Sequence, residues 1–418
     1  MMMAQPPRHP LLLPPFLLLL LLLHLYCPAQ ADRINALDLA ALREIRDDLT
    51  DLPGTDFFST WDFTSPDPCS DFAGVTCSGE PPRVTILTLG TGLSASPGLA
   101  GSLSPSLSKL TQLTQLVLFP GIVTGPIPPE LGRLTQLRVL SLTNNRLTGP
   151  IPTSISALRN LHTLDLSSNQ LTGPLPSSLS GLSQLKVLVL ASNRLSGELP
   201  KSLPAQLLHL DLKNNGFWGR LPLRLPEPLR YLSASGNQMW GPLNGLQSLS
   251  SELVYLDLSM NRFSGPIPAS LFRSTLSSML LQRNNLSGGL PPSSSSSPSY
   301  GPGSVVDLSH NSLGGEISTV LAGAESVFLN NNRLMGRVPV EYIDAVRRGS
   351  TRTLYLQHNY LTGFPVEGGL PDSASVCLAY NCMVPLVGLA TCPASAGGQL
   401  SRPMNQCPVF NHNDSSTG

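Results

Sequence analysis

One arrangement of apolar and polar positions returns along most of this chain. Two leucines separated by one residue precede an asparagine, and a glycine and a proline follow it, as in the segment from Leu140 to Pro152. The pattern L-x-L-x-x-N-x-L-x-G-x-[IL]-P returns every 21 to 27 residues, with its asparagine at positions 145, 169, 193, 215, 237, 261, 284, 311, 332 and 359. Gly121 takes the asparagine position of an eleventh copy, and a diverged copy starts near Val84. This period predicts a stack of coils.

Each fixed position of the repeat has a physical role. The L-x-L segment predicts a short strand, and strands of successive coils pair as a parallel sheet about 4.8 Å apart. The leucines stack in the core, while the asparagine amide satisfies backbone groups of neighbouring coils. Glycine permits the bend that follows, and proline keeps the backbone extended. The sequence therefore predicts an α/β repeat fold of about eleven strands, with a parallel β-sheet on its concave face.

The N-terminus has the pattern of a secretory leader. Arg8 and His9 precede an apolar run over residues 11–25, and Ala29-Gln30-Ala31 follows as a small-residue cleavage signal. The run contains two prolines and is shorter than the roughly 20 residues of a membrane-spanning helix. We expect a signal peptide at residues 1–31 and a secreted mature chain without a transmembrane segment; an uncleaved anchor is the alternative.

Six of the seven cysteines lie beyond the leader, and they gather at the two ends of the repeats: Cys69, Cys77, Cys377, Cys382, Cys392 and Cys407. An even number in an exported chain is typical of disulfides. Proximity favours Cys69–Cys77 and, less securely, Cys377–Cys382 and Cys392–Cys407, since four cysteines allow three pairings. A zinc site is disfavoured, because the chain has no C-x-x-C pair and no nearby histidine cluster.

The ends of the array are expected to be capped, because no coil can bury its own face. Apolar residues from Leu39 to Leu49 at helical spacing follow Asn35, and Pro53 and Gly54 are expected to close this helix. We predict an N-terminal cap over residues 32–83 with a helix and a disulfide. About 11–12 repeats follow over 84–365, with a loop insertion at 291–303, and then a cysteine-containing C-terminal cap and polar tail over 366–418.

The residues around the first two cysteines resemble a known family. Trp61-Asp62, Asp67-Pro68-Cys69 and the segment from Phe72 to Cys77 are similar to the N-terminal cap of plant extracellular leucine-rich-repeat proteins. The G-x-[IL]-P element is the plant-specific form of the repeat. The resemblance covers about residues 32–410 and implies a right-handed leucine-rich-repeat solenoid with disulfide-bonded caps.

The relatives that this resemblance implies are ectodomains of receptor-like kinases, receptor-like proteins and polygalacturonase-inhibiting proteins. We expect neither the kinase nor the transmembrane part of the first two groups, so the layout is similar to that of the free-standing secreted members. It departs from the pattern at Ala234, where a leucine belongs, and at Asn244 and Ser318, where a proline belongs.

Composition and motifs disfavour catalysis and nucleic-acid binding. The formal net charge is zero and 12% of residues are charged, which argues against electrostatic capture of nucleic acid. Nucleophile, phosphate-binding and metalloprotease motifs are missing. Aspartates recur in L-D-L segments, and we interpret them as repeat consensus on a solvated strand face: Asp165, Asp211, Asp257 and Asp307. We expect no enzyme, no metal and no cofactor. Two sequons predict glycosylation at Asn285 and Asn413.

Geometry locates a candidate binding surface. Residues that flank the strand leucines point to the concave side. Most are small or polar, and exposed aromatic residues among them are candidate ligand anchors: Phe119, Tyr231, Tyr255, Phe328 and Tyr355. Ordinary surface variation is the alternative. Four arginines directly follow a repeat asparagine: Arg146, Arg194, Arg262 and Arg333. We interpret them as part of the repeat consensus, and an anion-binding stripe is the alternative.

Three functions stay open for such a chain. The first is an extracellular recognition protein of the apoplast or cell wall, which binds a peptide, protein or wall ligand on its concave face. Because a soluble chain cannot signal across a membrane alone, such a role requires a partner such as a membrane receptor kinase, which would hold the chain peripherally at the plasma membrane. The second is an inhibitor of microbial polygalacturonase, and the third is a structural wall protein.

Overall fold

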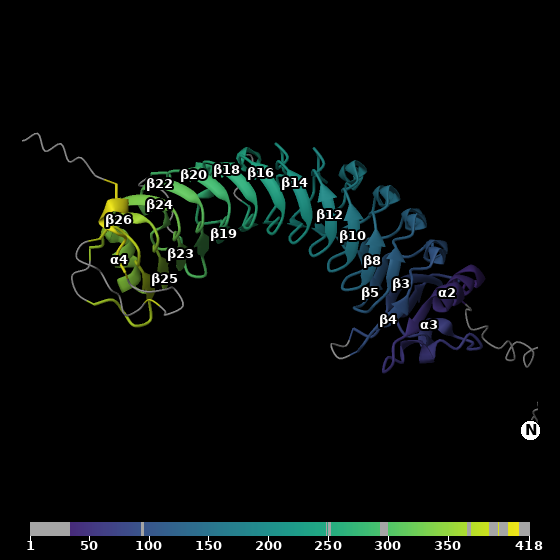
Figure 1. Cartoon of the computed structure of the whole chain (residues 1–418). Helices are drawn as coiled ribbons and strands as arrows, with labels where there is room; N and C mark the ends of the chain where they lie inside the picture. The colour runs from purple at the N-terminus through teal and green to yellow at the C-terminus, as the bar shows by residue number, and fades with distance from the viewer. Residues whose placement is uncertain are drawn as a thin grey trace, which may run out of the picture.

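The computed structural model describes residues 34–92, 96–247, 249, 252–292, 300–365, 369–383, 392 and 400–408. Over these residues the chain forms one arch of stacked coils (Figure 1). The expected signal peptide, the serine run of the insertion at 293–299 and the sequon at Asn413 lie outside the described residues.

A long sheet lines the inner side of the arch. Within the described residues it has fourteen strands in chain order, parallel except for the first pair, β2 and β3. The strands are β2 (Val75–Ser78), β3 (Arg83–Leu89), β5 (Gln115–Leu118), β7 (Val139–Ser141), β9 (Thr163–Asp165), β11 (Val187–Val189), β13 (His209–Asp211), β15 (Tyr231–Ser233), β17 (Tyr255–Asp257), β19 (Ser278–Leu280), β21 (Val305–Asp307), β23 (Ser326–Phe328), β25 (Thr353–Tyr355) and β27 (Ser375–Cys377).

A second sheet, which the sequence pattern did not predict, runs along one side of the arch. Its eleven strands within the described residues come from the segment after each repeat asparagine or, for the first strand, after Gly121. They are β6 (Thr124–Pro126), β8 (Arg146–Gly149), β10 (Gln170–Gly173), β12 (Arg194–Gly197), β14 (Gly216–Gly219), β16 (Gln238–Gly241), β18 (Arg262–Gly265), β20 (Asn285–Gly288), β22 (Ser312–Glu316), β24 (Arg333–Arg337) and β26 (Tyr360–Gly363). The glycine of this segment supplies the bend in the left-handed region, as at Gly149 with φ +77°.

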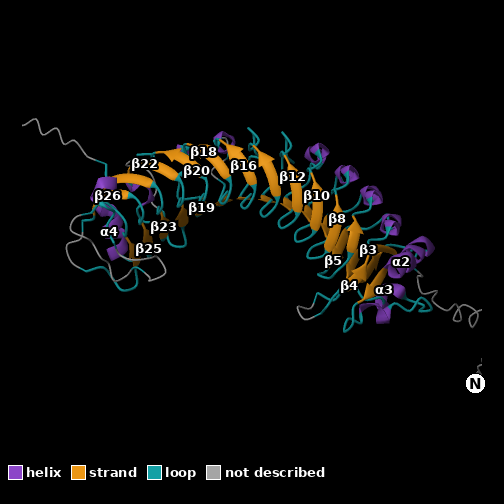
Figure 2. Cartoon of the chain, in the orientation of Figure 1, coloured by secondary structure: helices purple, strands orange, loops and turns teal. Residues whose placement is uncertain are grey.

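Short 3-10 helices occupy the outer side of the arch (Figure 2). They are η2 (Pro105–Lys109), η3 (Pro129–Arg133), η4 (Thr153–Ala157), η5 (Ser177–Gly181), η6 (Asn244–Leu246), η7 (Ala269–Leu271) and η8 (Thr319–Leu321). A longer helix, α4 (Val340–Arg347), takes this place near the C-terminal end. Because the helices are wider than the strands, the stack curves around the long sheet.

The repeat asparagines lie inside the coils and link them, as their positions predict. The amide nitrogen of Asn169 donates to the carbonyl of Leu142 over 2.7 Å, and its Oδ1 accepts from the backbone N–H of Leu147 over 3.0 Å. Both partners belong to the preceding coil. Equivalent bonds recur along the array, so polar backbone groups that face the dry interior are satisfied.

The array extends one coil beyond residue 365, where the sequence pattern predicted its end. Strand β27 pairs with β25, and Asn381 donates to Leu356 over 3.0 Å and accepts from Leu361 over 3.0 Å. The substitutions at Ala234, Asn244 and Ser318 leave the parallel register of the long sheet unbroken from β15 to β23. Ala234 itself is fully buried, so the core closes over the smaller side chain.

The N-terminal cap has the predicted helix with a different end. Helix α2 spans Ala36–Asp48 and begins at Asn35, whose side chain accepts from the backbone N–H of Leu37. It ends before Pro53, because the chain turns extended as β1 (Leu49–Asp51), which pairs with β4 (Leu99–Gly101). Further cap elements are η1 (Phe57–Thr60) and α3 (Pro68–Asp71).

Disulfides close both ends of the array. The predicted Cys69–Cys77 bond is confirmed. At the C-terminal end the favoured pairing is wrong: the bonds are Cys377–Cys392 and Cys382–Cys407. Cys377 and Cys382 both belong to the last coil, so each bond ties that coil to the segment that follows it. The segment ends in η10 (Met404–Gln406).

Candidate functional site

The five aromatic residues singled out on the concave strands are all half-buried, and they fall into three places. Tyr231 and Tyr255 lie side by side on β15 and β17. Phe328 and Tyr355 form an edge-to-face pair on β23 and β25, with ring centroids 5.2 Å apart. Phe119 lies apart from them near the N-terminal end, where its ring covers Gly92. The structure therefore offers two aromatic clusters.

The cluster at Tyr231 contains a third ring that sequence reasoning missed. His209 on β13 stacks on Tyr231 with centroids 4.0 Å apart and planes 4° apart. Tyr231 stacks on Tyr255 in the same way, at 4.4 Å and 3°. The three residues are direct partners in the parallel register, which places their rings one above the other. We call His209, Tyr231 and Tyr255 the aromatic ladder.

Aspartates of the same three-strand region lie beside the ladder. Asp211 is 5% exposed and Asp257 is 9% exposed. The prediction that these aspartates lie on a solvated strand face is therefore wrong at these two positions. Each Oδ1 accepts a bond from the backbone N–H two residues later, at 3.0 Å, from Lys213 and from Ser259. The ammonium of Lys213 lies 3.2 Å from Asp211. Asp257 has no such cation within the described residues.

Burial keeps the ladder uncharged near neutral pH. It raises the pKa of Tyr255 to about 12, with further contributions from Asp257 and Tyr231. Burial also raises the pKa of Tyr231 and lowers that of His209, because the charged form of each ring loses hydration. The ladder therefore presents three neutral rings beside one carboxylate that is paired and one that is not.

The remaining aspartates, arginines and sequon residue singled out in the sequence do not belong to the aromatic ladder. Asp165 and Asp307 accept the same backbone bond two residues on, so the L-D-L aspartates share a structural role. The arginines at 146, 194, 262 and 333 each begin a strand of the second sheet and are exposed, so they do not face the concave surface. Asn285 is exposed at the start of β20, while its neighbour Asn284 bonds the preceding coil.

The described residues contain neither a metal-binding cluster nor a membrane-spanning helix. Among them, His, Cys, Asp and Glu side chains form no group of three or more that could hold a metal ion. The helices found there are all too short or too polar to cross a membrane. The candidate site is built on strands whose positions are held by the asparagine bonds.

Family models match three parts of the chain. The leucine-rich-repeat N-terminal domain matches residues 35–78, and leucine-rich repeats match residues 135–195 and 252–274. The chain is a leucine-rich-repeat protein. These matches coincide with the N-terminal cap and with two stretches of coils, and the predicted solenoid is confirmed. No curated protein sequence matches the chain significantly.

Solved structures of plant leucine-rich-repeat proteins share its fold. The ectodomain of the Arabidopsis thaliana membrane receptor kinase GASSHO1/SCHENGEN3, in complex with CASPARIAN STRIP INTEGRITY FACTOR 2, is 30% identical over 84% of this chain and 47% of that one, with a TM-score of 0.61. The plant peptide hormone receptor RGFR1, in complex with RGF2, is 28% identical over 68% and 50%, with a TM-score of 0.57. This leucine-rich-repeat chain thus spans about half the length of those receptors.

A plant ice-binding protein is also similar, at 27% identity and a TM-score of 0.55, over 80% of this chain and 97% of that one. The fold therefore serves proteins with unlike ligands, and function has to be argued from the site. What the likeness establishes is that this leucine-rich-repeat chain has the architecture of plant ectodomains whose structures hold a bound ligand.

Proposed function

We propose that the chain is an extracellular recognition protein that binds an extended peptide on its concave face, with a basic side chain of the peptide at the aromatic ladder. The observation that carries the proposal is the unpaired carboxylate of Asp257 beside the stacked rings of Tyr231 and Tyr255. The similarity to a plant peptide hormone receptor in complex with RGF2 supports a peptide as the class of ligand. Three disulfides support an oxidising compartment.

Shape and charge favour a cation at this place. The next residue along the row of rings is Ser278, the register partner of Tyr255, and its side chain is too short to cover the outer ring face. A guanidinium or ammonium group on that face gains a cation–π contact. It also lies beside a carboxylate whose charge is uncompensated, in a region where water is partly excluded and charge pairing is strong.

The rest of the face suits an extended chain. Strands spaced about 4.8 Å apart present their flanking residues in rows, so a peptide that crosses the strands meets a new side chain at each coil. The second aromatic cluster, Phe328 with Tyr355, lies further along on β23 and β25. It offers an apolar anchor at the far end of such a peptide.

A display library of short peptides with and without arginine or lysine tests the proposal on the mature chain. We expect enrichment of basic peptides, and a loss of about tenfold in their affinity with Asp257→Asn, which keeps the bond from Ser259 but removes the charge. Tyr231→Ala/Tyr255→Ala should abolish enrichment. Trp218→Ala, on the second sheet, is the matched control and should bind as the wild type does. Equal enrichment of basic and neutral peptides by all variants would refute the proposal.

An inhibitor of polygalacturonase remains the second candidate, since the concave face can also contact a folded enzyme. Titration of the purified chain against fungal polygalacturonase separates the two: a dose-dependent loss of hydrolysis favours the inhibitor, and a flat response removes it. A structural wall role predicts retention in salt-washed wall, whereas recovery in apoplastic fluid contradicts it.

A further inference from the structure

The row of helices on the outer side of the arch is interrupted at two successive coils. Between η5 and η6, residues 200–206 and 222–228 form turns instead of 3-10 helices. The repeat asparagines on either side are spaced by 22 residues, from 193 to 215 and from 215 to 237, against 24 in the two preceding coils. Pro204 and Pro226 also lie within these short segments, and proline removes a backbone donor that a helix needs. Two short coils therefore lie next to each other.

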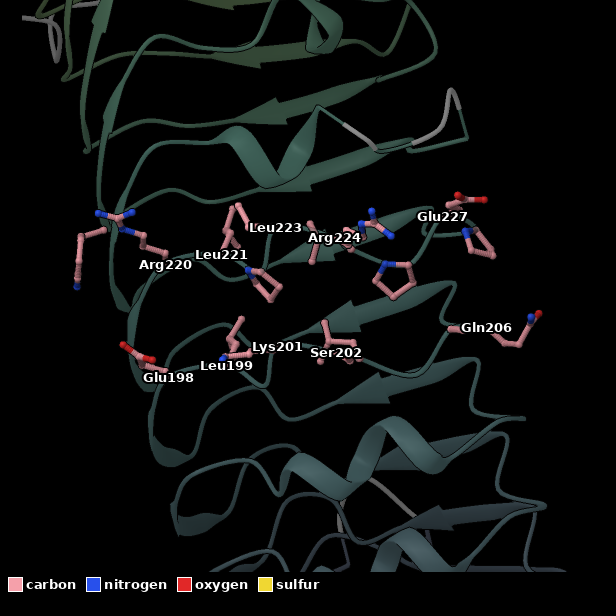
Figure 3. A pocket seen from close by; sticks show the side chains of 17 residues that line it. Glu198, Leu199, Lys201, Ser202, Gln206, Arg220, Leu221, Leu223, Arg224 and Glu227 are labelled. Carbon is pink, nitrogen blue, oxygen red and sulfur yellow. The ribbon is translucent and has the colours of Figure 1, made fainter.

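A cleft of about 1100 Å³ lies between them (Figure 3). This volume is slightly above the roughly 300–1,000 Å³ that small-molecule sites span. Its lining includes four core leucines, 199, 203, 221 and 225, which are 5–8% exposed and belong to the hydrophobic core. Leu223 adds a side chain that is 80% exposed, and Trp240 is 42% exposed. A concave site lined by apolar side chains with a few charged groups is the form that small-molecule sites take.

The lining of the cleft carries more positive than negative charge, with three basic side chains against the carboxylates of Glu198 and Glu227. Lys201 lies on one wall and Arg224 on the other, while Glu198 and Arg220 share one end (Figure 3). Neither Lys201 nor Arg224 forms a salt bridge with another residue that the structure describes. At the Glu198 end, the guanidinium of Arg220 lies over the Trp240 ring at 5.0 Å. The two wall cations therefore remain available to an anion, in a chain whose formal net charge is zero.

We propose that this cleft binds a small amphipathic organic acid, with its carboxylate between Lys201 and Arg224 and its apolar body along the leucine floor toward Trp240. A guanidinium presents a planar fork of donors that matches a carboxylate, and a lysine across the cleft adds a second charge-assisted bond. The leucine floor supplies the apolar contribution to affinity. The site lies on the outer side of the arch, so it is independent of the peptide proposed for the concave face.

Dodecanoate, below its micelle concentration, is the probe, and 1-dodecanol is its uncharged match. Trp240 lines the cleft, so quenching or a shift of tryptophan fluorescence reports binding, and calorimetry gives the stoichiometry. We expect saturation at one dodecanoate per chain and at least about tenfold weaker binding of dodecanol. Trp240→Phe should remove most of the fluorescence response while calorimetric binding persists.

Variants separate the site from general apolar adsorption. Lys201→Gln/Arg224→Gln should weaken dodecanoate about tenfold and leave dodecanol unchanged. Ala205→Phe, at an exposed position of the lining, should fill the cleft and weaken both probes. Arg146→Gln/Arg333→Gln is the charge-matched control on the second sheet and should bind as the wild type does.

Two results with the wild-type chain would overturn the proposal: the absence of saturable dodecanoate binding, and equal affinity for dodecanoate and dodecanol. An unchanged affinity of the Lys201→Gln/Arg224→Gln variant for dodecanoate would overturn it as well. Binding of an acidic, leucine-containing peptide at the cleft without any binding of dodecanoate would assign the cleft to a peptide partner, and would equally refute a small organic acid.

Discussion

The side-chain amide of Asn261 donates a hydrogen bond to the backbone carbonyl of Ala234, one coil earlier, over 2.8 Å. The same side chain accepts from the backbone N–H of Met239 over 3.0 Å and donates to Leu258 within its own coil. One buried asparagine therefore satisfies backbone groups of two coils at once. Because equivalent asparagines link each coil to its neighbour, these side-chain hydrogen bonds stabilise the whole array.

Asn261→Ala should lower the free energy of unfolding by about 2–4 kcal/mol, because it leaves a buried N–H and buried carbonyls without partners. Chemical denaturation monitored by circular dichroism measures the loss. Gln238→Ala is the control, since Gln238 is exposed one position after a repeat asparagine; its effect should stay within about 0.5 kcal/mol. Equal stability of both variants would show that the asparagine bonds do not hold the coils together.

The C-terminal disulfides should map as Cys377–Cys392 and Cys382–Cys407 in the oxidised protein. Cys382 and Cys407 enclose a segment that carries Arg402, whose guanidinium lies over the rings of Tyr360 and Tyr380. Cys382→Ala/Cys407→Ala should cost about 3 kcal/mol, because it frees this loop in the unfolded chain. Peptide mapping by mass spectrometry and thermal unfolding check both statements, and recovery of a Cys392–Cys407 peptide would contradict them.

Stability should fall as the pH is lowered through the range in which His209 takes up a proton. Its pKa is lowered by burial from the ordinary value of 6.5, so the unfolded chain binds the proton at a higher pH than the folded chain does. The stabilising contribution is complete above the ordinary pKa and is lost as the pH falls from 6.5 toward the lowered value.

His209→Phe keeps a ring in the ladder and removes this titration. The change of melting temperature between pH 7 and pH 5 should be smaller in the variant than in the wild type. His310 and His358, whose pKa values burial also lowers, stay present in both proteins and cancel in the comparison. An identical pH profile in the two proteins would show that His209 is not buried against Tyr231 in solution.

Asn285 should carry a glycan when the chain is made in a secretory host, because it is exposed on β20 and lies in an N-x-S sequon. Enzymatic removal of N-glycans should reduce the mass, and Asn285→Gln should abolish the shift at this site with little loss of stability. Asn284→Gln should instead destabilise the fold, because its amide bonds Leu258 in the preceding coil. A glycan-free Asn285 in folded, secreted protein would contradict the expected exposure.

The repeat itself could be predicted from the sequence, because each coil is specified by local contacts that recur at a fixed period. Alternation of leucines, one buried asparagine and a glycine at the bend determine the strand, its register and the inner face. For the same reason Tyr231 and Tyr255 could be placed on that face. His209 occupies the position just before the first leucine of its coil, as Tyr231 and Tyr255 do in the next two coils. A comparison of equivalent positions across coils would therefore have found it.

Other features depended on where separate coils meet. The pairing of Cys377 with Cys392 follows from the position of one further coil, whose strand and asparagine, Val376 to Asn381, were expected to belong to the C-terminal cap. The second sheet needs the bends of successive coils to align, and the burial of Asp211 and Asp257 needs the ladder beside them. The cleft arises because two short coils are neighbours. The sequence by itself determined the coil and its inward face, since those contacts repeat locally; the tertiary structure decided disulfide partners, ring stacking and the cleft, since these depend on packing between residues that no periodic rule relates.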